Sequence, residues 1–363
     1  MSSDELLVKK HVKYFQMCLN VLPSRLQKED SNKLMIIYCC IAGLSILKYQ
    51  FTIQEKTDLL NFIYEHLVDT GEGFRGSLTH KLYTGAVGAN YDPPTIANTY
   101  CALCILSMIE EDFTEKLDKL QIMKYLIKCQ DQEDGSIRSI VDINDQPFGD
   151  GDLRQTYMAL CIRKMLNYNP LEYQGLDLNL SKIEENILGQ ICFDGGLGLG
   201  ESHAGYTFCG LTSLKLIGKL NTQDSRWNKT INWLIHRQID FNEYNKELLN
   251  TPFGDDIDIG SHNGRDNKFG DTCYSFWCSS SLALFDKEFF IDGPKTEKYL
   301  LEVTQNNILG GFAKSDADDP DPYHSFLALS ALTIINSHCK NELEPIDPLL
   351  SITLKASTFL KKD

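Results

Sequence analysis

The chain has 363 residues, of which 42% are hydrophobic and 23% charged, as is typical of a globular protein with a sizeable core. Its 35 basic and 50 acidic residues give a net charge of −15 at pH 7, which argues against a nucleic-acid-binding protein. The longest apolar stretch, residues 34–47, is about five residues too short to span a bilayer, and the first ten residues contain no apolar signal core. We therefore expect a cytoplasmic protein without a transmembrane segment.

Most of the twelve cysteines lie inside apolar helical patterns. In a reducing compartment such cysteines are usually small buried hydrophobic residues rather than disulfide partners. Cys101 and Cys104 form a CxxC pair, but no second pair completes a structural zinc site. We expect this pair to belong to the core.

Six apolar segments share one pattern along the chain, with the first of them divergent. In the pattern, Thr or Ser precedes Tyr or Phe, and small and apolar residues follow at helical spacing. The segments are residues 35–44, 97–106, 154–163, 205–214, 273–282 and 323–332. The aligned aromatic residues are Tyr38, Tyr100, Tyr157, Phe208, Phe276 and Phe326. The 3.6-residue period predicts helices, and the small residues predict close helix packing.

A second set of helical segments alternates with the first. These segments are residues 11–22, 57–68, 120–129, 180–191, 227–238 and 298–309. Most of them lead into a glycine-rich turn such as DGGLGLG (194–200), which suits the end of a helix. Six such helical hairpins predict an all-α protein, an α/α toroid with one ring of helices inside another. An open solenoid would have shorter and nearly constant repeats. We expect one domain over residues 1–363.

The fifth hairpin carries a surface insertion at about residues 242–264, rich in Asn, Asp and Gly. Such a composition is typical of an exposed loop. The DDID sequence at 255–258 within it is predicted to be solvated charge rather than a metal-binding or proton-donating motif.

Unusual polar residues gather at the N-terminal ends of the inner helices, which should meet at one end of the toroid. Cys273 and His324 occupy almost equivalent positions in adjacent hairpins, so they should lie close in space, and Asp271 stands beside Cys273. Asp, Cys and His side chains suit a tetrahedral zinc site with one open position, and helix N-termini favour thiolates. The alternative is a helix cap, a core thiol and a surface histidine.

Arg265 and Lys268 lie on a loop at the same end, near His203 and Tyr274. Cationic and hydroxyl donors at helix N-termini bind anions, and a diphosphate would fit. Otherwise the two cations are simply solvated. Below this group lie aromatic residues that form either ordinary core or a pocket for a long apolar tail. They are Tyr100, Tyr157, Tyr206, Phe208 and Trp277.

Three segments resemble a known family, the β subunits of protein prenyltransferases. They are ESHAGYTFCGL (201–211), GRDNKFGDTCYSFW (264–277) and DPYHSF (321–326), and the resemblance extends over nearly the whole chain. HVKYFQMCLNVLPSR (11–25) is most similar to the type I geranylgeranyl-transferring members. The resemblance implies an α/α toroid that is active as a heterodimer with a helical α subunit.

The resemblance also implies roles for individual residues. One zinc ion is bound by Asp271, Cys273 and His324, and Lys314 joins them as a catalytic residue. The diphosphate contacts His203, Arg265, Lys268 and Tyr274. The isoprenoid contacts Arg154, Tyr157, Tyr206, Cys209, Trp277 and Met35, and the peptide contacts Thr95, Ala97, Tyr100, Arg154 and Tyr323. The implied reaction transfers a geranylgeranyl group from geranylgeranyl diphosphate to the cysteine of a C-terminal CaaX motif, mostly CaaL, in proteins such as Rho-type small GTPases.

Four positions bear on which member of the family the chain resembles. Met35 stands where farnesyl-transferring enzymes carry a bulky Trp, and Lys314 where they carry a magnesium-binding Asp. These two residues imply a longer isoprenoid and a reaction that does not require magnesium. Tyr323 and Thr95 depart from the type I pattern, which has Leu and His there, and Tyr323 matches the farnesyl-transferring enzymes instead. Both residues leave the preference for the last CaaX residue open.

Three alternatives remain from the sequence. One is a farnesyltransferase-type β subunit. A second is a terpene-cyclase-like toroid, a class that lacks this zinc set and uses a DxDD acid. The third is a helical-repeat scaffold without catalytic activity.

Overall fold

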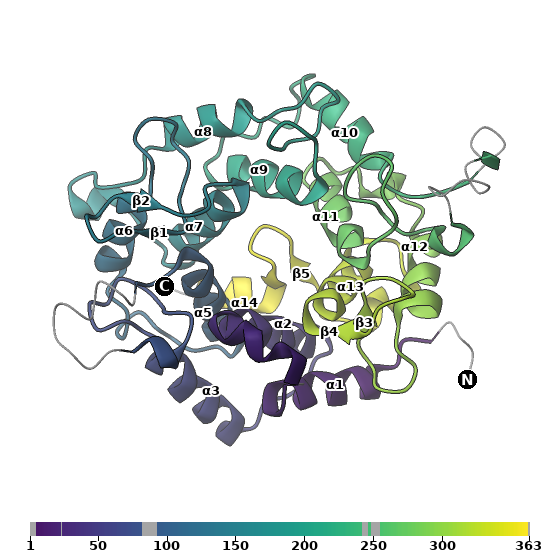
Figure 1. The fold of residues 1–363 in the computed structure, drawn as a ribbon, viewed down its shortest axis with the longest axis horizontal. Helices are drawn as coiled ribbons and strands as arrows, with labels where there is room; N and C mark the ends of the chain where they lie inside the picture. The colour runs from purple at the N-terminus through teal and green to yellow at the C-terminus, as the bar shows by residue number, and fades with distance from the viewer. Residues whose placement is uncertain (1–4, 23, 82–92, 242–245, 248–254, 362–363) are drawn as a thin grey trace.

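The computed structural model describes residues 5–22, 24–81, 93–241, 246–247 and 255–361 and shows two concentric rings of helices (Figure 1). In the described part of the chain the inner ring consists of α2 (Lys33–Ile46), α5 (Ile96–Met108), α7 (Leu153–Met165), α9 (Ala204–Leu216), α11 (Thr272–Ala283) and α13 (Pro322–Ile334). Each inner helix packs against the next, and α13 packs against α2, so the ring is closed. The predicted α/α toroid is confirmed.

The outer ring alternates with the inner one along the chain, which produces the six predicted hairpins. Its described helices are α1 (Val8–Asn20), α3 (Ile53–Glu65), α6 (Lys119–Lys128), α8 (Leu180–Leu188), α10 (Trp227–Ile235) and α12 (Gly293–Lys298), the last continuing into a π-helical segment, Tyr299–Thr304. The start of α3 lies four residues before the predicted one, because Thr52 and Glu55 form a reciprocal capping box there. None of the described helices is long and apolar enough to cross a membrane.

The inner helices are buried on nearly all sides. In α5 every residue except Ala97 is buried, because neighbouring inner helices cover two sides and outer helices a third. Small residues permit the close approach that this packing needs. A Cβ atom on Gly43 of α2 would lie 2.2 Å from Cζ of Phe15 in α1, so the two helices meet at a glycine.

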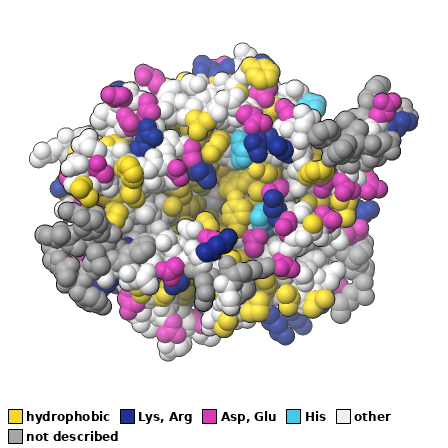
Figure 2. Space-filling view, viewed as in Figure 1, with side chains coloured by type: hydrophobic (Ala, Val, Ile, Leu, Met, Phe, Trp, Pro, Cys, Tyr) yellow, Lys and Arg dark blue, Asp and Glu magenta, His cyan; other side chains and the backbone are white. Residues whose placement is uncertain are grey.

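Polar residues cap the N-terminal ends of the inner helices other than α2, and these ends lie at one end of the toroid. In each case the side chain accepts a hydrogen bond from a backbone N–H in the first turn. These caps are Thr95, Asp152, His203, Asp271 and Asp321. Figure 2 shows a hollow in the centre of one face, lined by hydrophobic side chains and bordered by charged residues and histidine. We call this face the mouth.

Two short β-hairpins precede inner helices. They pair β1 (Ile140–Val141) with β2 (Pro147–Phe148), and β3 (Phe312–Ala313) with β4 (Pro320–Asp321). Each leads into the N-terminus of the following inner helix, α7 or α13, and therefore stands at the mouth.

A third β-hairpin, close to the C-terminus, enters the ring from the opposite end. It pairs β5 (Ile346–Asp347) with β6 (Ile352–Thr353), followed by α14 (Leu354–Phe359), and its loop lies at the centre of the ring in Figure 1. Inner-ring tyrosines hold this loop: Tyr100 Oη donates to the Leu350 carbonyl at 2.9 Å, and Tyr157 Oη bonds Ser351 Oγ at 2.9 Å. The sequence pattern did not predict this hairpin, which gives the central hollow a floor.

About half of the predicted insertion at 242–264, residues 242–245 and 248–254, lies outside the described residues, and its role as a surface loop stays a prediction. The described part contains the DDID sequence. Here the prediction of solvated charge is wrong for Asp258, which is buried and accepts a hydrogen bond from the Gly270 N–H at 2.9 Å. Asp255 and Asp256 are exposed, as predicted.

His11 of α1 joins the first hairpin to the last. Its ring is fully buried and stacks on Phe312 with a centroid distance of 4.7 Å. Nδ1 accepts the Gly311 N–H at 2.9 Å, so the neutral ring carries its proton on Nε2 and donates it to Gln305 Oε1 at 2.8 Å. Burial lowers the pKa of His11 from 6.5 to about 4, although the bond to Gln305 opposes this shift.

We expect this histidine to make the fold sensitive to acid. The unfolded chain binds a proton at His11 near pH 6.5 and the folded chain only near pH 4, so stability falls as pH drops through that window. Between pH 7.5 and 5 the free energy of unfolding should fall by about 2 kcal/mol more in the wild type than in His11→Gln, whose amide can donate and accept but does not titrate. Urea unfolding of both proteins across this range measures the difference. Parallel pH profiles would contradict the prediction.

Candidate metal centre and substrate pocket

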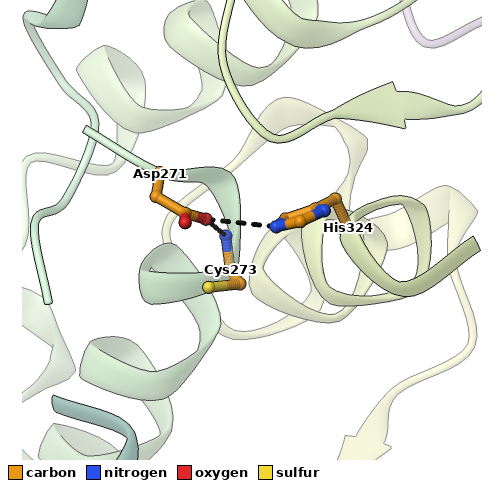
Figure 3. Close-up of side chains that lie close together, drawn as sticks. All are labelled: Asp271, Cys273 and His324. Atoms are coloured by element: carbon orange, nitrogen blue, oxygen red, sulfur yellow. Dashed lines mark hydrogen bonds and ion pairs between the residues drawn. The ribbon is translucent and has the colours of Figure 1, made fainter. Parts of the chain in front are cut away.

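Asp271, Cys273 and His324 come together at the mouth, as the repeat alignment predicted (Figure 3). Asp271 is the N-cap of α11, where its Oδ1 accepts the Cys273 N–H at 2.9 Å. His324 lies in the first turn of α13, the inner helix beside α11. One ligand atom from each of the three lies within 4.8 Å of the others. This spacing allows one metal ion to contact all three.

Asp321, which the sequence analysis did not single out, orients His324. It is the N-cap of α13, so Oδ1 accepts the His324 N–H at 2.9 Å while Oδ2 accepts from Nδ1 at 2.6 Å. Nε2 therefore points at Asp271, at 3.3 Å from its Oδ1. A carboxylate behind a ligating histidine is the usual support of a metal site. An acid three residues before a histidine at a helix start was the available sequence signal.

The protonation of the three ligands suits a cation. Burial lowers the pKa of His324, but hydrogen bonds to Asp271 and Asp321 outweigh it and raise the pKa to about 9. Burial, and then the charge of Asp271, hold the pKa of the Cys273 thiol well above its usual value of 9.0. The ligands therefore hold protons that a divalent cation would replace. One thiolate, one imidazole and one carboxylate with room for a fourth ligand match the preferences of Zn²⁺.

Trp277 lies one turn after Cys273 on α11 and connects this centre with the aromatic pocket, because its ring packs on Phe208 with a centroid distance of 4.8 Å. Burial, the largest cause, raises the pKa of both Cys273 and Tyr323. The Tyr323 ring also stands edge-on to His324, at a centroid distance of 5.1 Å. The candidate metal ligands and the aromatic wall therefore face the same space.

His203 and Tyr274 form a hydrogen-bonded pair beside the metal centre. His203 is the N-cap of α9, and its Nδ1 accepts the N–H groups of Gly205 and Tyr206 at 3.1 and 3.4 Å. A neutral ring that accepts at Nδ1 has its proton on Nε2, which donates to Tyr274 Oη at 3.0 Å. Burial and the charge of Arg265 lower the pKa of His203, which keeps the ring neutral. The Tyr274 hydroxyl proton is then available to an anion.

The predicted cations lie on the loop before α11 and on the turn after β3. Arg265 Nη1 bonds Glu201 Oε2 at 3.0 Å, an acid that the sequence analysis did not assign to the site. Lys268 is exposed on the same loop as Arg265. Lys314 is exposed on the turn after β3, and its carbonyl accepts the Thr272 N–H at 3.0 Å, next to the start of α11. The structure thus places the three cations at the mouth.

The residues predicted to contact the isoprenoid line the inner wall. Phe208 packs on Tyr157 and Trp277 with centroid distances of 5.4 and 4.8 Å. Arg154 lies over the Tyr206 ring at 5.7 Å and pairs with Asp152 at 2.5 Å. The other two predicted residues differ in exposure: Cys209 is buried, and Met35, in the first turn of α2, is 41% exposed. These positions form a mostly apolar surface below the cations.

The residues predicted to contact the peptide also have structural roles. Thr95 caps α5 by accepting the Asn98 N–H at 3.1 Å, and Tyr100 holds the C-terminal hairpin. Ala97 and Tyr323 are partly exposed near the helix starts. Their peptide contacts stay predictions.

A DxDD sequence does occur in the chain, as DADD at residues 316–319. Its three aspartates are exposed on the turn between β3 and β4, outside the hollow. A cyclase acid must protonate a substrate inside a dry cavity, so this exposed turn does not suit that role.

Comparison with known proteins agrees with the fold. Residues 6–352 match the family described as "Prenyltransferase alpha-alpha toroid domain". The chain therefore belongs to the prenyltransferase family with the alpha-alpha toroid domain.

Individual proteins of this family are similar to the chain over most of its length. The chain is 29% identical over 371 residues to a geranylgeranyl transferase type-1 subunit beta of Dictyostelium discoideum, covering 96% of this chain and 95% of the relative. It is 24% identical to the protein farnesyltransferase subunit beta of Schizosaccharomyces pombe, covering 92% and 79%. The solved structure of Candida albicans protein geranylgeranyltransferase-I complexed with GGPP superposes with a TM-score of 0.89 at 37% identity, covering 99% of both chains.

Proposed function

We propose that this chain is the catalytic β subunit of a zinc-dependent type I geranylgeranyltransferase. It transfers the geranylgeranyl group of geranylgeranyl diphosphate to the cysteine of C-terminal CaaX motifs, mostly CaaL. The observation that carries the proposal is the convergence of Asp271, Cys273 and His324 within 4.8 Å at the mouth of a hollow lined by hydrophobic side chains. The similarity to type-1 subunits over nearly the full chain supports the choice of isoprenoid.

The proposed reaction replaces a C–O bond by a C–S bond. Asp271, Cys273 and His324 would hold the zinc ion, which would supply a Lewis acid that lowers the pKa of a thiol beside it. The substrate cysteine gives up its thiol proton to solvent, and its sulfur bonds to C1 of the isoprenoid while the bond from C1 to the diphosphate oxygen breaks. Asp321 keeps His324 Nε2 directed at the metal position. The electron pair of the broken bond leaves with the diphosphate, and Tyr274, Arg265 and Lys268 stabilise the charge that develops there.

Two residues adapt this site to a long isoprenoid and to low magnesium. Met35 is flexible and partly exposed, so it leaves room for a longer chain than a Trp would. Lys314 is proposed to place its ammonium group by the diphosphate, where it partly replaces a magnesium ion. The reaction should therefore not require magnesium.

The proposal includes partners that this chain does not contain. An α subunit completes the heterodimer, and the protein substrates are CaaX proteins such as Rho-type small GTPases. We place the enzyme in the cytoplasm, where such substrates are made.

A competition assay tests the proposed function. The chain is co-expressed with its α subunit, freed of added magnesium, and given equal amounts of geranylgeranyl and farnesyl diphosphate with either a CaaL or a CaaS peptide. We expect geranylgeranyl transfer to CaaL without magnesium. Preferred farnesyl transfer would favour the farnesyltransferase-type alternative and make Tyr323 a better guide than Met35. No transfer to either peptide, with zinc bound, would overturn the proposal.

A further inference from the structure

We propose that Arg237 is a positioning residue for the loop that carries two of the diphosphate-binding cations. We define this diphosphate loop as residues 262–270; Arg265 and Lys268 lie on it, with Asp266 between them. The inference rests on the proposed function, because it assumes that these cations bind a diphosphate. It assigns a task to a side chain that does not itself reach the substrate site.

Arg237 is a buried cation with a fixed geometry. It follows α10, and its side chain is only 6% exposed. Nε donates to the Trp233 carbonyl at 3.2 Å, the guanidinium lies over the Trp233 ring at 4.6 Å, and Nη2 donates to Asp266. The planar guanidinium makes these contacts at once, which fixes the direction of the bond to Asp266. Trp233 is itself buried, so the anchor is rigid.

The two ends of the diphosphate loop are held mainly through backbone groups. At its start, the Asn263 N–H donates to the Arg237 carbonyl and the Gly264 carbonyl accepts the Ala204 N–H, both at 2.9 Å. At its end, the Gly270 N–H bonds the buried Asp258 at 2.9 Å. The middle turns through Asn267, which has a left-handed φ of 58°. The Arg237–Asp266 pair fixes this middle part to the body of the protein.

The pair also controls a charge beside the proposed anion site. The Asp266 carboxylate is 56% exposed and lies between Arg265 and Lys268 in sequence. Released from Arg237, it could pair with either cation and would repel a diphosphate. Arg237 therefore both fixes the loop and keeps this acid away from the cations.

The test uses the α/β complex and compares wild type with Arg237→Met. We expect the apparent affinity for geranylgeranyl diphosphate to fall by about tenfold, as for loss of a well-placed charge-assisted hydrogen bond. The KM for the CaaL peptide and the zinc content should not change. Arg237→Lys keeps the charge but not the planar guanidinium. This variant should fold readily, and its affinity for geranylgeranyl diphosphate should fall by about threefold.

Two further variants separate positioning from general stability. Arg163→Met is the matched control, because Arg163 also pairs with an aspartate through its guanidinium. Its Nε and Nη2 donate to Asp177 at 2.8 and 2.6 Å, in the last turn of α7 away from the mouth. It should lower the melting temperature without changing the affinity for the diphosphate substrate. Adding Asp266→Asn to Arg237→Met should recover part of the lost affinity, because the released acid is gone.

The outcomes distinguish the inference from the proposed function. The inference is overturned if Arg237→Met and Arg237→Lys both bind the diphosphate substrate within twofold of wild type, or if peptide affinity falls equally. The inference is also overturned if adding Asp266→Asn to Arg237→Met recovers none of the lost affinity for the diphosphate substrate. If the wild type transfers a farnesyl group instead, the proposed function fails, but the loop is tested in the same way because farnesyl diphosphate presents the same diphosphate.

Discussion

Replacing Cys273 with Ala is expected to remove the bound zinc and to slow prenyl transfer by about a thousandfold, because metal activation of a nucleophile supplies several kcal/mol. The remaining ligands, Asp271 and His324, already form an ion pair at 3.3 Å and would bind each other rather than a metal. Metal analysis of the purified complex and a single-turnover transfer assay measure both effects.

Cys278→Ala is the matched control for this experiment. Cys278 lies on the same helix α11 and is fully buried, but it is not among the three grouped ligands. It should retain one zinc per β subunit and nearly full activity. Stoichiometric zinc in Cys273→Ala, or an equal loss of zinc in both variants, would show that Cys273 is not a ligand.

The Gly264→Ala variant is expected to fold normally and to lose about a hundredfold in transfer rate, the typical loss when one donor to a developing anion is removed. A Cβ atom at this position would lie 2.0 Å from Tyr274 Cζ and 2.5 Å from its Oη, so the phenol must move away. This movement breaks its 3.0 Å bond with His203 and takes its hydroxyl from the proposed leaving group. Single-turnover rates and zinc content are the measurements.

Gly43→Ala serves as the control, because it should lower the stability of the protein and leave the transfer rate unchanged. Its Cβ would lie 2.2 Å from Phe15 Cζ, but Phe15 is completely buried and cannot swing aside. Overpacking of this kind costs about 1–3 kcal/mol of stability. The Gly43→Ala protein should therefore melt earlier and retain its transfer rate. If Gly264→Ala retained its rate while melting earlier, the role of Tyr274 would need to be reassigned.

The sequence predicted the two rings because their helices repeat. The aligned aromatic residues placed each inner helix within a few residues of its observed bounds, and the same alignment predicted that Cys273 and His324 meet. The C-terminal hairpin has no counterpart in the repeat, so periodicity could not reveal it. The tyrosine hydroxyls that bond its loop show where it lies.

Parts of the site depended on contacts that no repeat encodes. Glu201 acts on Arg265, which was identified, yet it is an ordinary acid until its neighbour in space is known. Asp321 differs, because it stands three residues before His324 at a helix start, which is a local sequence signal. Asp258 shows the reverse case, since its sequence context is polar and exposed, but the turn buries it under Gly270. Local composition predicts the average exposure of a segment. It does not predict the exposure of one residue whose side chain makes a specific hydrogen bond.

The contact between His11 and Gln305 joins residues 294 positions apart, and this has a consequence for how the protein is made. Until the ribosome has released α13, helix α2 lacks the neighbour that covers one of its sides. Helix α1 likewise depends on late residues, because its His11 bonds Gln305 and Gly311. Contacts this distant form late and leave apolar surface exposed meanwhile. We expect nascent chains that end before α13 to be bound by chaperones, and the full chain to become resistant to protease only after its last hairpin has emerged.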